Sequence, residues 1–478
     1  MSESALPKSR LGRRAVMGGT LAALVGTTAL GGLVVRQARA EDGEEQPEAG
    51  KGDGGYGELK PVTRKDPETG HEQTLLLPEG FDFTLLSLAG TELADGAVTP
   101  LAHDGTCAFP GPDDRTVRLV RNHEDRNESD STHPSGPDPD KRYDGKGGGG
   151  TTTVQVRIGD DGVPALDKAW TSLSGTIVNC AGGPTPSGSW LSCEETTAGP
   201  DAGWEQPHGY IFEVPSTAEE SVDPVPLKAM GRFVHEAIAV DPSTGYVYET
   251  EDQDTAGLYR FIPEDADDLA AGGKLQMLKV VGEDKYDTRT GQEVGAELPV
   301  EWVDIADPDP ENAEADALAV YKQGVDQGAA TFARLEGAIT HEDAVYISST
   351  SGGDVEQGQI WELRPAEGDD GVLRLLYESP DQETLSFPDN VTVSPKGALL
   401  ICEDTDREYA SLQGLTMDGE IFPFCTDEGG GEWTGCTFSP DGKYLFANLQ
   451  GSTDGDPSKP ADPGRTLAFW GPWENGDF

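Results

Sequence analysis

The chain has 478 residues and a formal net charge of −52, because 87 Asp and Glu residues outnumber 35 Lys and Arg residues. So acidic a protein repels the phosphate backbone of DNA and RNA, which excludes nucleic acid as a partner. With 62 Gly, 34 Pro and 35% hydrophobic residues, the composition favours a turn-rich, largely β protein over a helical bundle.

The first 40 residues have the organisation of an export signal. Arg13 and Arg14 precede an uncharged, glycine-rich stretch over 15–35, and Ala38-Arg39-Ala40 is a small-x-small cleavage site. The adjacent arginines predict export by the twin-arginine translocation machinery to a secreted or cell-envelope location. The alternative is an uncleaved N-terminal anchor, but the stretch is weakly apolar for a bilayer span, so we expect no stable membrane insertion after cleavage.

Residues 41–75 are rich in Glu, Gly and Lys and have no hydrophobic period, which predicts a flexible segment. Over 76–478 one pattern recurs: a short apolar stretch, a turn with Pro, Asp or Gly, and a second strand that ends in Asn, Asp or Glu. Its six copies are residues 107–124, 183–195, 238–252, 338–354, 391–404 and 436–450. Six similar hairpins predict an all-β fold, a six-bladed β-propeller in a single domain.

Two stretches depart from this hairpin pattern and are predicted as insertions. The stretch near 125–150 is polar and ends in four glycines, and the stretch near 262–330 is predicted to be partly helical. The alternative to a propeller is a β-sandwich that contains six unrelated hairpins. We expect a monomer.

The six cysteines are Cys107, Cys180, Cys193, Cys402, Cys425 and Cys436. None forms a CxxC pair, which excludes a zinc ribbon. In an exported protein they allow fifteen disulfide pairings, and Cys402, Cys425 and Cys436 are the leading candidates for disulfides.

Acidic and amide side chains end the second strands of the predicted hairpins. These are Asn122 and Glu124, Glu194 and Glu195, Glu251 and Asp252, and Glu403 and Asp404, with Asn448 or Gln450 completing the set. Equivalent strand ends of a propeller have equivalent radial positions, so these side chains converge at the channel mouth, where burial without a partner is costly. Many hard oxygen ligands favour calcium, whereas Cys180, a thiolate among carboxylates, favours a transition metal.

Several blocks resemble the PhoX family of bacterial alkaline phosphatases over about residues 80 to 455. They are NHE at 122–124, NCAGG at 179–183, CEE at 193–195, HEA at 235–237, TED at 250–252, RLEGA at 334–338, PDN at 388–390, CED at 402–404 and SPDG at 439–442. The resemblance implies a six-bladed propeller that is exported by the twin-arginine route. It also implies a site of iron and calcium ions that hydrolyses phosphate monoesters, with small-molecule phosphate esters as substrates.

The resemblance also implies roles for individual residues. Cys180 and Glu336 would ligate iron, and Arg334 would bind the phosphate. The other candidate metal ligands, which the resemblance does not divide between iron and calcium, are Glu124, Glu194, Glu195, Glu236, Asp252, Asp389, Asn390, Glu403 and Asp404. Leu335 stands where the family pattern leads us to expect Pro, and Ser187 stands where family members often have a bulkier residue. These two departures put the shape of the substrate pocket in doubt but not the binding of metal.

Three histidines stand beside acidic residues, and two other functions remain open. His123 and His235 are interpreted as hydrogen-bonded structural residues rather than ligands, and His103-Asp104-Gly105 is a further candidate for lining the site. One alternative function is a calcium-dependent propeller lactonase or phytase-like hydrolase, which needs oxygen ligands only. The other is a non-enzymatic, calcium-stabilised extracellular binding protein.

Overall fold

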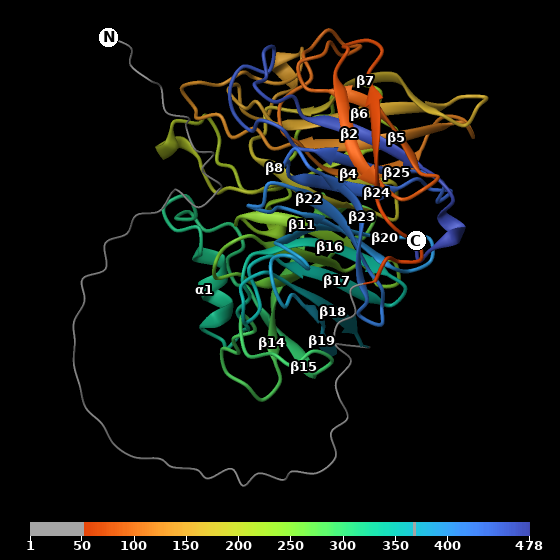
Figure 1. Ribbon diagram of the computed structural model, residues 1–478. Coiled ribbons are helices and arrows are strands. Elements are labelled where there is room, and N and C mark those ends of the chain that lie inside the picture. The colour runs from red at the N-terminus through yellow and green to blue at the C-terminus, as the bar shows by residue number, and fades with distance from the viewer. Residues whose placement is uncertain (1–51, 367–369) are drawn as a thin grey trace, which may run out of the picture. The chain divides into compact units, whose positions relative to one another are not determined.

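The computed structural model describes residues 52–366 and 370–478, so the predicted signal peptide lies outside the described residues. Within this part of the chain the regular structure is almost entirely β, as the all-β prediction requires (Figure 1). The one α-helix among the described residues is α1 (Ala319–Val325). No described helix is long and apolar enough to span a bilayer.

All six predicted hairpins are formed, and each begins a set of consecutive antiparallel strands. The first hairpin is β4 (His103–Pro110) with β5 (Thr116–His123), followed by β6 (Gly150–Ile158) and β7 (Pro164–Ser174). The second hairpin is β8 (Asn179–Pro184) with β9 (Ser189–Glu194), followed by β10 (Ile211–Pro215).

The third and fourth hairpins belong to one nine-stranded sheet. The third is β11 (His235–Val240) with β12 (Val247–Glu251), followed by β13 (Leu258–Pro263) and β14 (Gly273–Val280). The fourth is β16 (Leu335–His341) with β17 (Ala344–Ser349), followed by β18 (Gln359–Pro365) and β19 (Gly371–Glu378). The strand β15 (Glu297–Asp304) pairs with both β14 and β19 and so joins the two sets.

The fifth and sixth hairpins take in strands from the N-terminal side of the chain. The fifth is β20 (Pro388–Val393) with β21 (Leu399–Glu403), followed by β22 (Ala410–Leu415), β23 (Ile421–Asp427), β2 (Glu72–Leu77) and β1 (Lys60–Lys65). The sixth is β24 (Trp433–Phe438) with β25 (Leu445–Leu449), followed by β26 (Arg465–Trp470) and β3 (Asp82–Leu88).

The first strands of the six hairpins form a closed ring. Taken in the order β4, β8, β11, β16, β20 and β24, each strand contacts the one after it, and β24 contacts β4. Sheets that radiate from a closed ring of inner strands define a β-propeller and exclude a two-sheet sandwich. The sheet of the sixth hairpin has β3 as its outermost strand, which pairs with β26 although the two strands are far apart in the sequence.

The two predicted insertions contain α1 and two of the five 3-10 helices of the described residues. Residues 125–150 include the 3-10 helix η1 (Pro139–Lys141), and four further 3-10 helices are η2 (Pro200–Ala202), η3 (Lys228–Met230), η4 (Leu269–Ala271) and η5 (Trp473–Asn475). The stretch near 262–330 contains α1 and η4, but its residues 273–280 form β14, a regular strand of the third set.

The prediction of a flexible segment over 41–75 is wrong for its second half. Residues 60–65 form β1 and residues 72–77 form β2, which lies beside the blue C-terminal strands in Figure 1 and pairs with β23. The side chains of β1 are largely exposed, so its sequence carries no hydrophobic period. Its position depends on backbone pairing with β2 along its whole length instead.

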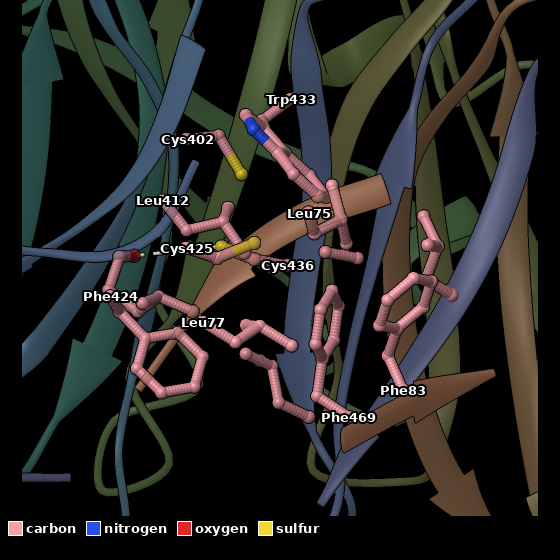
Figure 2. Packing of buried hydrophobic residues seen from close by; sticks show 14 of the residues in the cluster. Leu75, Leu77, Phe83, Cys402, Leu412, Phe424, Cys425, Trp433, Cys436 and Phe469 are labelled. Carbon is pink, nitrogen blue, oxygen red and sulfur yellow. Dashed lines mark hydrogen bonds between the residues drawn. The ribbon is translucent and has the colours of Figure 1, made fainter. Parts of the chain in front are cut away.

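The disulfide prediction for Cys402, Cys425 and Cys436 is also wrong, because all six cysteines are free thiols. Figure 2 shows these three side chains within a hydrophobic cluster that includes Trp433 and Leu75. Burial raises the pKa of the Cys425 thiol, so it stays protonated and packs as a small hydrophobic group.

Candidate metal centre

Each of the six inner strands carries a β-bulge at the same place. The register shifts lie between His103 and Thr106, Asn179 and Gly182, His235 and Ile238, Leu335 and Ala338, Pro388 and Val391, and Thr434 and Thr437. A bulge bends its strand and redirects a side chain, and bulges are frequent beside active sites. In the first five strands the residues that begin the shifted segments are Asp104, Cys180, Glu236, Glu336 and Asp389. In β24 the equivalent residue is Thr434, which follows Trp433 and still pairs with Asn448. We call these six residues the bulge series.

A second series is held by one backbone hydrogen bond that recurs in all six hairpins. The N–H that follows the second strand donates to the carbonyl oxygen two residues before the bulge residue. The pairs are Glu124 with Ala102, Glu195 with Val178, Asp252 with Val234, Thr350 with Arg334, Asp404 with Phe387, and Gln450 with Glu432. Four of the donors carry carboxylates, so this rim series adds acidic side chains beside the bulge series.

Four of the six acceptor residues have left-handed backbones although none is glycine. Their φ values are 45° at Ala102, 47° at Val178, 42° at Arg334 and 52° at Phe387. Such conformations are strained for residues with a Cβ and concentrate at functional sites. Because this strained conformation recurs two residues before four of the bulge residues, it indicates that the bulge series belongs to a functional site.

The two series meet in three overlapping groups of ligand atoms. Within each group, one atom from every residue lies within 4.8 Å of the others. The groups are Asp104, Glu124 and Cys180; Cys180, Glu195 and Glu236; and Glu236, Glu336 and Asp389. Because Cys180 and Glu236 are shared, the three groups form one continuous chain of candidate ligands that runs from the first hairpin to the fifth.

Several carboxylate atoms of these groups are buried without a compensating hydrogen bond. Among the described residues, both oxygens of Glu236, Oε2 of Glu336 and Oδ2 of Asp389 have no hydrogen-bond partner. Burial raises the pKa of Glu236 and of Asp389 well above the usual range, and neighbouring carboxylates raise it further. Converging buried oxygens of this kind are costly unless protons or cations neutralise them, so the residues fit a multivalent cation centre.

Cys180 gives the centre its only sulfur ligand among these groups. Its thiol is buried, and burial together with the nearby carboxylates of Asp104, Glu236, Glu124 and Glu195 raises its pKa well above the usual value. Coordination by a metal ion deprotonates such a thiol. The donor set of one thiolate and several carboxylates therefore fits a transition metal together with a harder cation.

Two arginines neutralise parts of this acidic ring. Arg334 donates to Asp252 at 3.0 Å from Nε and is also paired with Glu336. Arg126 donates to Glu124 at 2.6 Å from Nε and is paired with Glu195. Burial and the opposing pull of Arg334 together set the pKa of Glu336, which is raised to about 7.

The structure does not bring Glu194 and Glu403 into the ligand groups. Glu194 accepts hydrogen bonds from the His208 ring at 2.6 Å and from the backbone of Ile177, Gly209 and Tyr210. Glu403 is paired with Arg407 and accepts from the backbone N–H groups of Ser386 and Ser411. Both carboxylates organise loops beside the ring.

Three other predicted residues lie at the edge of the groups. Asp252 contacts Arg334, and Asp404 acts electrostatically on Arg334 and Glu336. The Asn390 amide donates to Asp389 at 2.8 Å, and its oxygen accepts from the Gly435 N–H at 2.6 Å. Asn390 therefore orients Asp389 across the junction of the fifth and sixth hairpins.

The sequence prediction missed Arg126 and gave Asp104 and Gln450 only minor roles. The Gln450 amide lies 2.7 Å from Asp104 and 2.6 Å from Glu124, so it bridges the sixth hairpin to the first. Arg126 stands two residues after Glu124 in the sequence, and this adjacency is the signal that would have identified it.

A cavity lies beside the residues that follow the bulge series. The cavity is lined from all six inner strands, mostly by residues that follow the bulge series, such as Gly105, Ala181, Ala237, Gly337 and Gly435. Fold and site together define a β-propeller with a buried, acidic candidate metal centre that contains a thiol and is flanked by arginines.

Comparisons with known proteins identify the family. The family model described as alkaline phosphatase PhoX matches residues 55–453, so the chain belongs to the PhoX family, and it is a phosphatase. No curated protein matches the chain.

Solved structures with similar folds include one member of this family. The structure titled as Pseudomonas fluorescens PhoX in complex with vanadate, a transition state analogue, has a TM-score of 0.65 at 18% identity and covers 88% of this chain and 98% of that one. At this identity the similarity establishes the fold. A gluconolactonase from Xanthomonas campestris (TM-score 0.35, 12% identity, 82% and 98% coverage) and one from Pseudomonas aeruginosa (0.36, 14%, 86% and 98%) are too distant to carry an argument.

Proposed function

We propose that the chain is an exported alkaline phosphatase that releases inorganic phosphate from phosphate monoesters and uses iron and calcium ions held by the ring. The observation that carries this proposal is the continuous chain of ligand groups, in which Cys180 and Glu236 are each shared by two groups. Membership of the PhoX family supports the same reaction.

We assign the ions from the chemistry of the donors. The two groups that share Cys180 suit iron, because thiolate is a soft ligand for which calcium has little affinity. The group of Glu236, Glu336 and Asp389 offers oxygen ligands alone, which suits calcium. This assignment differs from the family resemblance, which implies Glu336 as an iron ligand with Cys180, because the two residues share no ligand group. When bound, such ions act as Lewis acids that stabilise the charge that develops on transferring phosphoryl oxygens.

The residues of the chain itself bind and orient the ester. Arg334 itself has the left-handed backbone conformation just before β16, and its side chain is about 21% exposed, so it reaches solvent. Its contacts with Asp252 and Glu336 hold the guanidinium beside the ligand groups. A guanidinium is a planar, permanently charged donor matched to phosphate oxygens, so Arg334 is the proposed phosphate-binding residue.

The overall charge makes a cationic site necessary for this substrate. A chain of net charge −52 repels a phosphate dianion at long range. Cations held by the ring, together with the two arginines, would reverse the field locally and attract the ester. A phosphate ester would therefore be attracted to the site and repelled by the rest of the protein surface.

Export is supported by the sequence of residues 1–40. Residues 1–40 contribute six basic side chains and one acidic one, so cleavage after Ala40 would leave 29 basic and 86 acidic residues and a charge of −57. Replacement of Arg13 and Arg14 by lysines should keep the protein in the cytoplasm if the twin-arginine route is used. Fractionation with unchanged export would contradict that route.

The test of the proposed function is elemental analysis of the folded, exported protein paired with hydrolysis of p-nitrophenyl phosphate before and after calcium chelation. We expect iron and calcium together, with hydrolysis lost on chelation. Glu236→Gln removes a carboxylate that two groups share, so it should lower both the metal content and the activity. The matched control is Glu283→Gln, an exposed carboxylate beyond β14.

Two outcomes would contradict the proposal. Calcium without iron would favour an oxygen-only propeller hydrolase, and no hydrolysis with both metals bound would favour a binding protein. Glu236→Gln protein with full metal content would show that the shared ligand position is wrongly assigned.

A further inference from the structure

Arg126 occupies a junction between two of the candidate ligand groups. Its guanidinium contacts Glu124, a member of the group that contains Asp104, and Glu195, a member of the group that contains Glu236. Its side chain is about one-third exposed, and its backbone N–H donates to the Thr453 carbonyl at 2.8 Å. Arg126 is thus anchored at its backbone while its charged end lies at the solvent side of the ring.

The position of Arg126 parallels that of Arg334. Arg126 spans the first and second hairpins through two rim residues, Glu124 and Glu195. Arg334 spans the third and fourth hairpins through the rim residue Asp252 and the bulge residue Glu336. The shared ligands Cys180 and Glu236 belong to the second and third hairpins, so they lie on the ring between the two guanidinium groups.

Cations in the ring would compete with Arg126 for its present partners. Glu124 and Glu195 are ligand candidates, and a multivalent ion attracts a carboxylate more strongly than a partly exposed guanidinium does. The guanidinium would then carry positive charge that these two carboxylates no longer neutralise. Its nearest chemically matched partner would be an anion held by the same ions.

We propose that Arg126 is a second phosphate-binding residue, which together with Arg334 holds the phosphoryl group of the substrate from two sides. This inference rests on the proposed function. Two planar guanidinium groups and the bound cations would together neutralise the charge of the phosphoryl oxygens. Arg126 therefore strengthens recognition of the phosphate and contributes little to recognition of the leaving group.

The test compares Arg126→Gln and Arg126→Lys with the wild-type holoenzyme. The probes are inorganic phosphate, titrated by calorimetry, and inhibition of p-nitrophenyl phosphate hydrolysis by phosphate, with iron and calcium measured in every sample. We expect Arg126→Gln to weaken phosphate binding about 10- to 100-fold at unchanged metal content, because it removes charge-assisted hydrogen bonds. Arg126→Lys keeps the positive charge but loses the planar pair of N–H donors, so its phosphate affinity should lie between those of the wild type and Arg126→Gln.

Arg115→Gln is the control, since Arg115 is exposed in the first hairpin turn and pairs with Asp160. Phosphate affinity within twofold of wild type in Arg126→Gln would overturn the inference. Loss of iron or calcium in step with loss of affinity would overturn it as well, because Arg126 would then organise the ligands. If wild-type holoenzyme binds no phosphate, the proposed function fails, which is a different result from a wild type that binds phosphate and a variant that binds it equally.

Discussion

The buried contact of His208 with Glu194 makes the stability of the protein depend on pH. His208 Nδ1 lies 2.6 Å from Glu194 Oε1, and Nε2 lies 3.5 Å from Asp144 Oδ2, with all three side chains inaccessible to solvent. Burial lowers the pKa of His208, but the two carboxylates outweigh it and raise the pKa from 6.5 to about 9. The folded protein therefore binds a proton that the unfolded chain releases at neutral pH.

A raised pKa in the folded state stabilises the protein fully below pH 6.5, and the effect is lost as the pH rises through 9. A shift of this size corresponds to about 3 kcal/mol. His208→Gln removes the titrating group, so it should cost about 3 kcal/mol more at pH 6 than at pH 9.5.

Urea unfolding of wild type and His208→Gln at pH 6, 8 and 9.5 measures this difference. Subtraction of the two curves cancels the other groups that titrate in the same range. The control is His341→Gln, a partly exposed histidine at the end of β16. A stability difference between wild type and His208→Gln that stays constant from pH 6 to 9.5 would refute the reasoning.

Three further predictions concern packing and cysteine chemistry. Glu249→Met should raise the free energy of unfolding by about 1–4 kcal/mol, because the Glu249 carboxylate is buried and has no hydrogen-bond partner among the described residues; lower stability in urea would contradict this. Titration with a thiol reagent in denaturant without reductant should find six thiols per chain, and four or fewer would reveal disulfides. Gly105→Ala should cost about 1–3 kcal/mol, because its Cβ would lie 2.6 Å from the Ala181 Cα of the neighbouring strand; unchanged thermal unfolding would show that the two strands move apart freely.

The hairpins were predictable from the sequence because their turn chemistry is local. A Pro-Asp-Gly or Ser-Thr-Gly turn between β-prone stretches determines a hairpin without reference to the rest of the chain. The strand β1 was not predictable, because it owes its place to backbone pairing with β2 rather than to a pattern of its own. The cysteines were misread because exported location argues for disulfides, whereas these thiols pack as hydrophobic side chains.

The structure brings some of the predicted site residues together in the ligand groups and places others outside them. Adjacent acidic pairs such as Glu194 with Glu195 were all assigned to the metal, but successive side chains of a strand point to opposite sides. Only the second of that pair faces the ligand groups, while the first is bonded to His208. Asp104 received little weight because the bulge that directs it depends on register with β5, which a single sequence does not reveal.

The pairing of β3 with β26 has a consequence for the folding of the newly synthesised chain. The first strand of that pair begins at Asp82 and the second at Arg465, so the two strands can pair only after all the residues between them have been synthesised. Long-range pairing of this kind makes folding slow. A nascent or prematurely terminated chain would hold the acidic residues without the architecture that gathers them, so no fragment should have partial activity. Metal binding at the proposed site would therefore follow the pairing of β3 with β26.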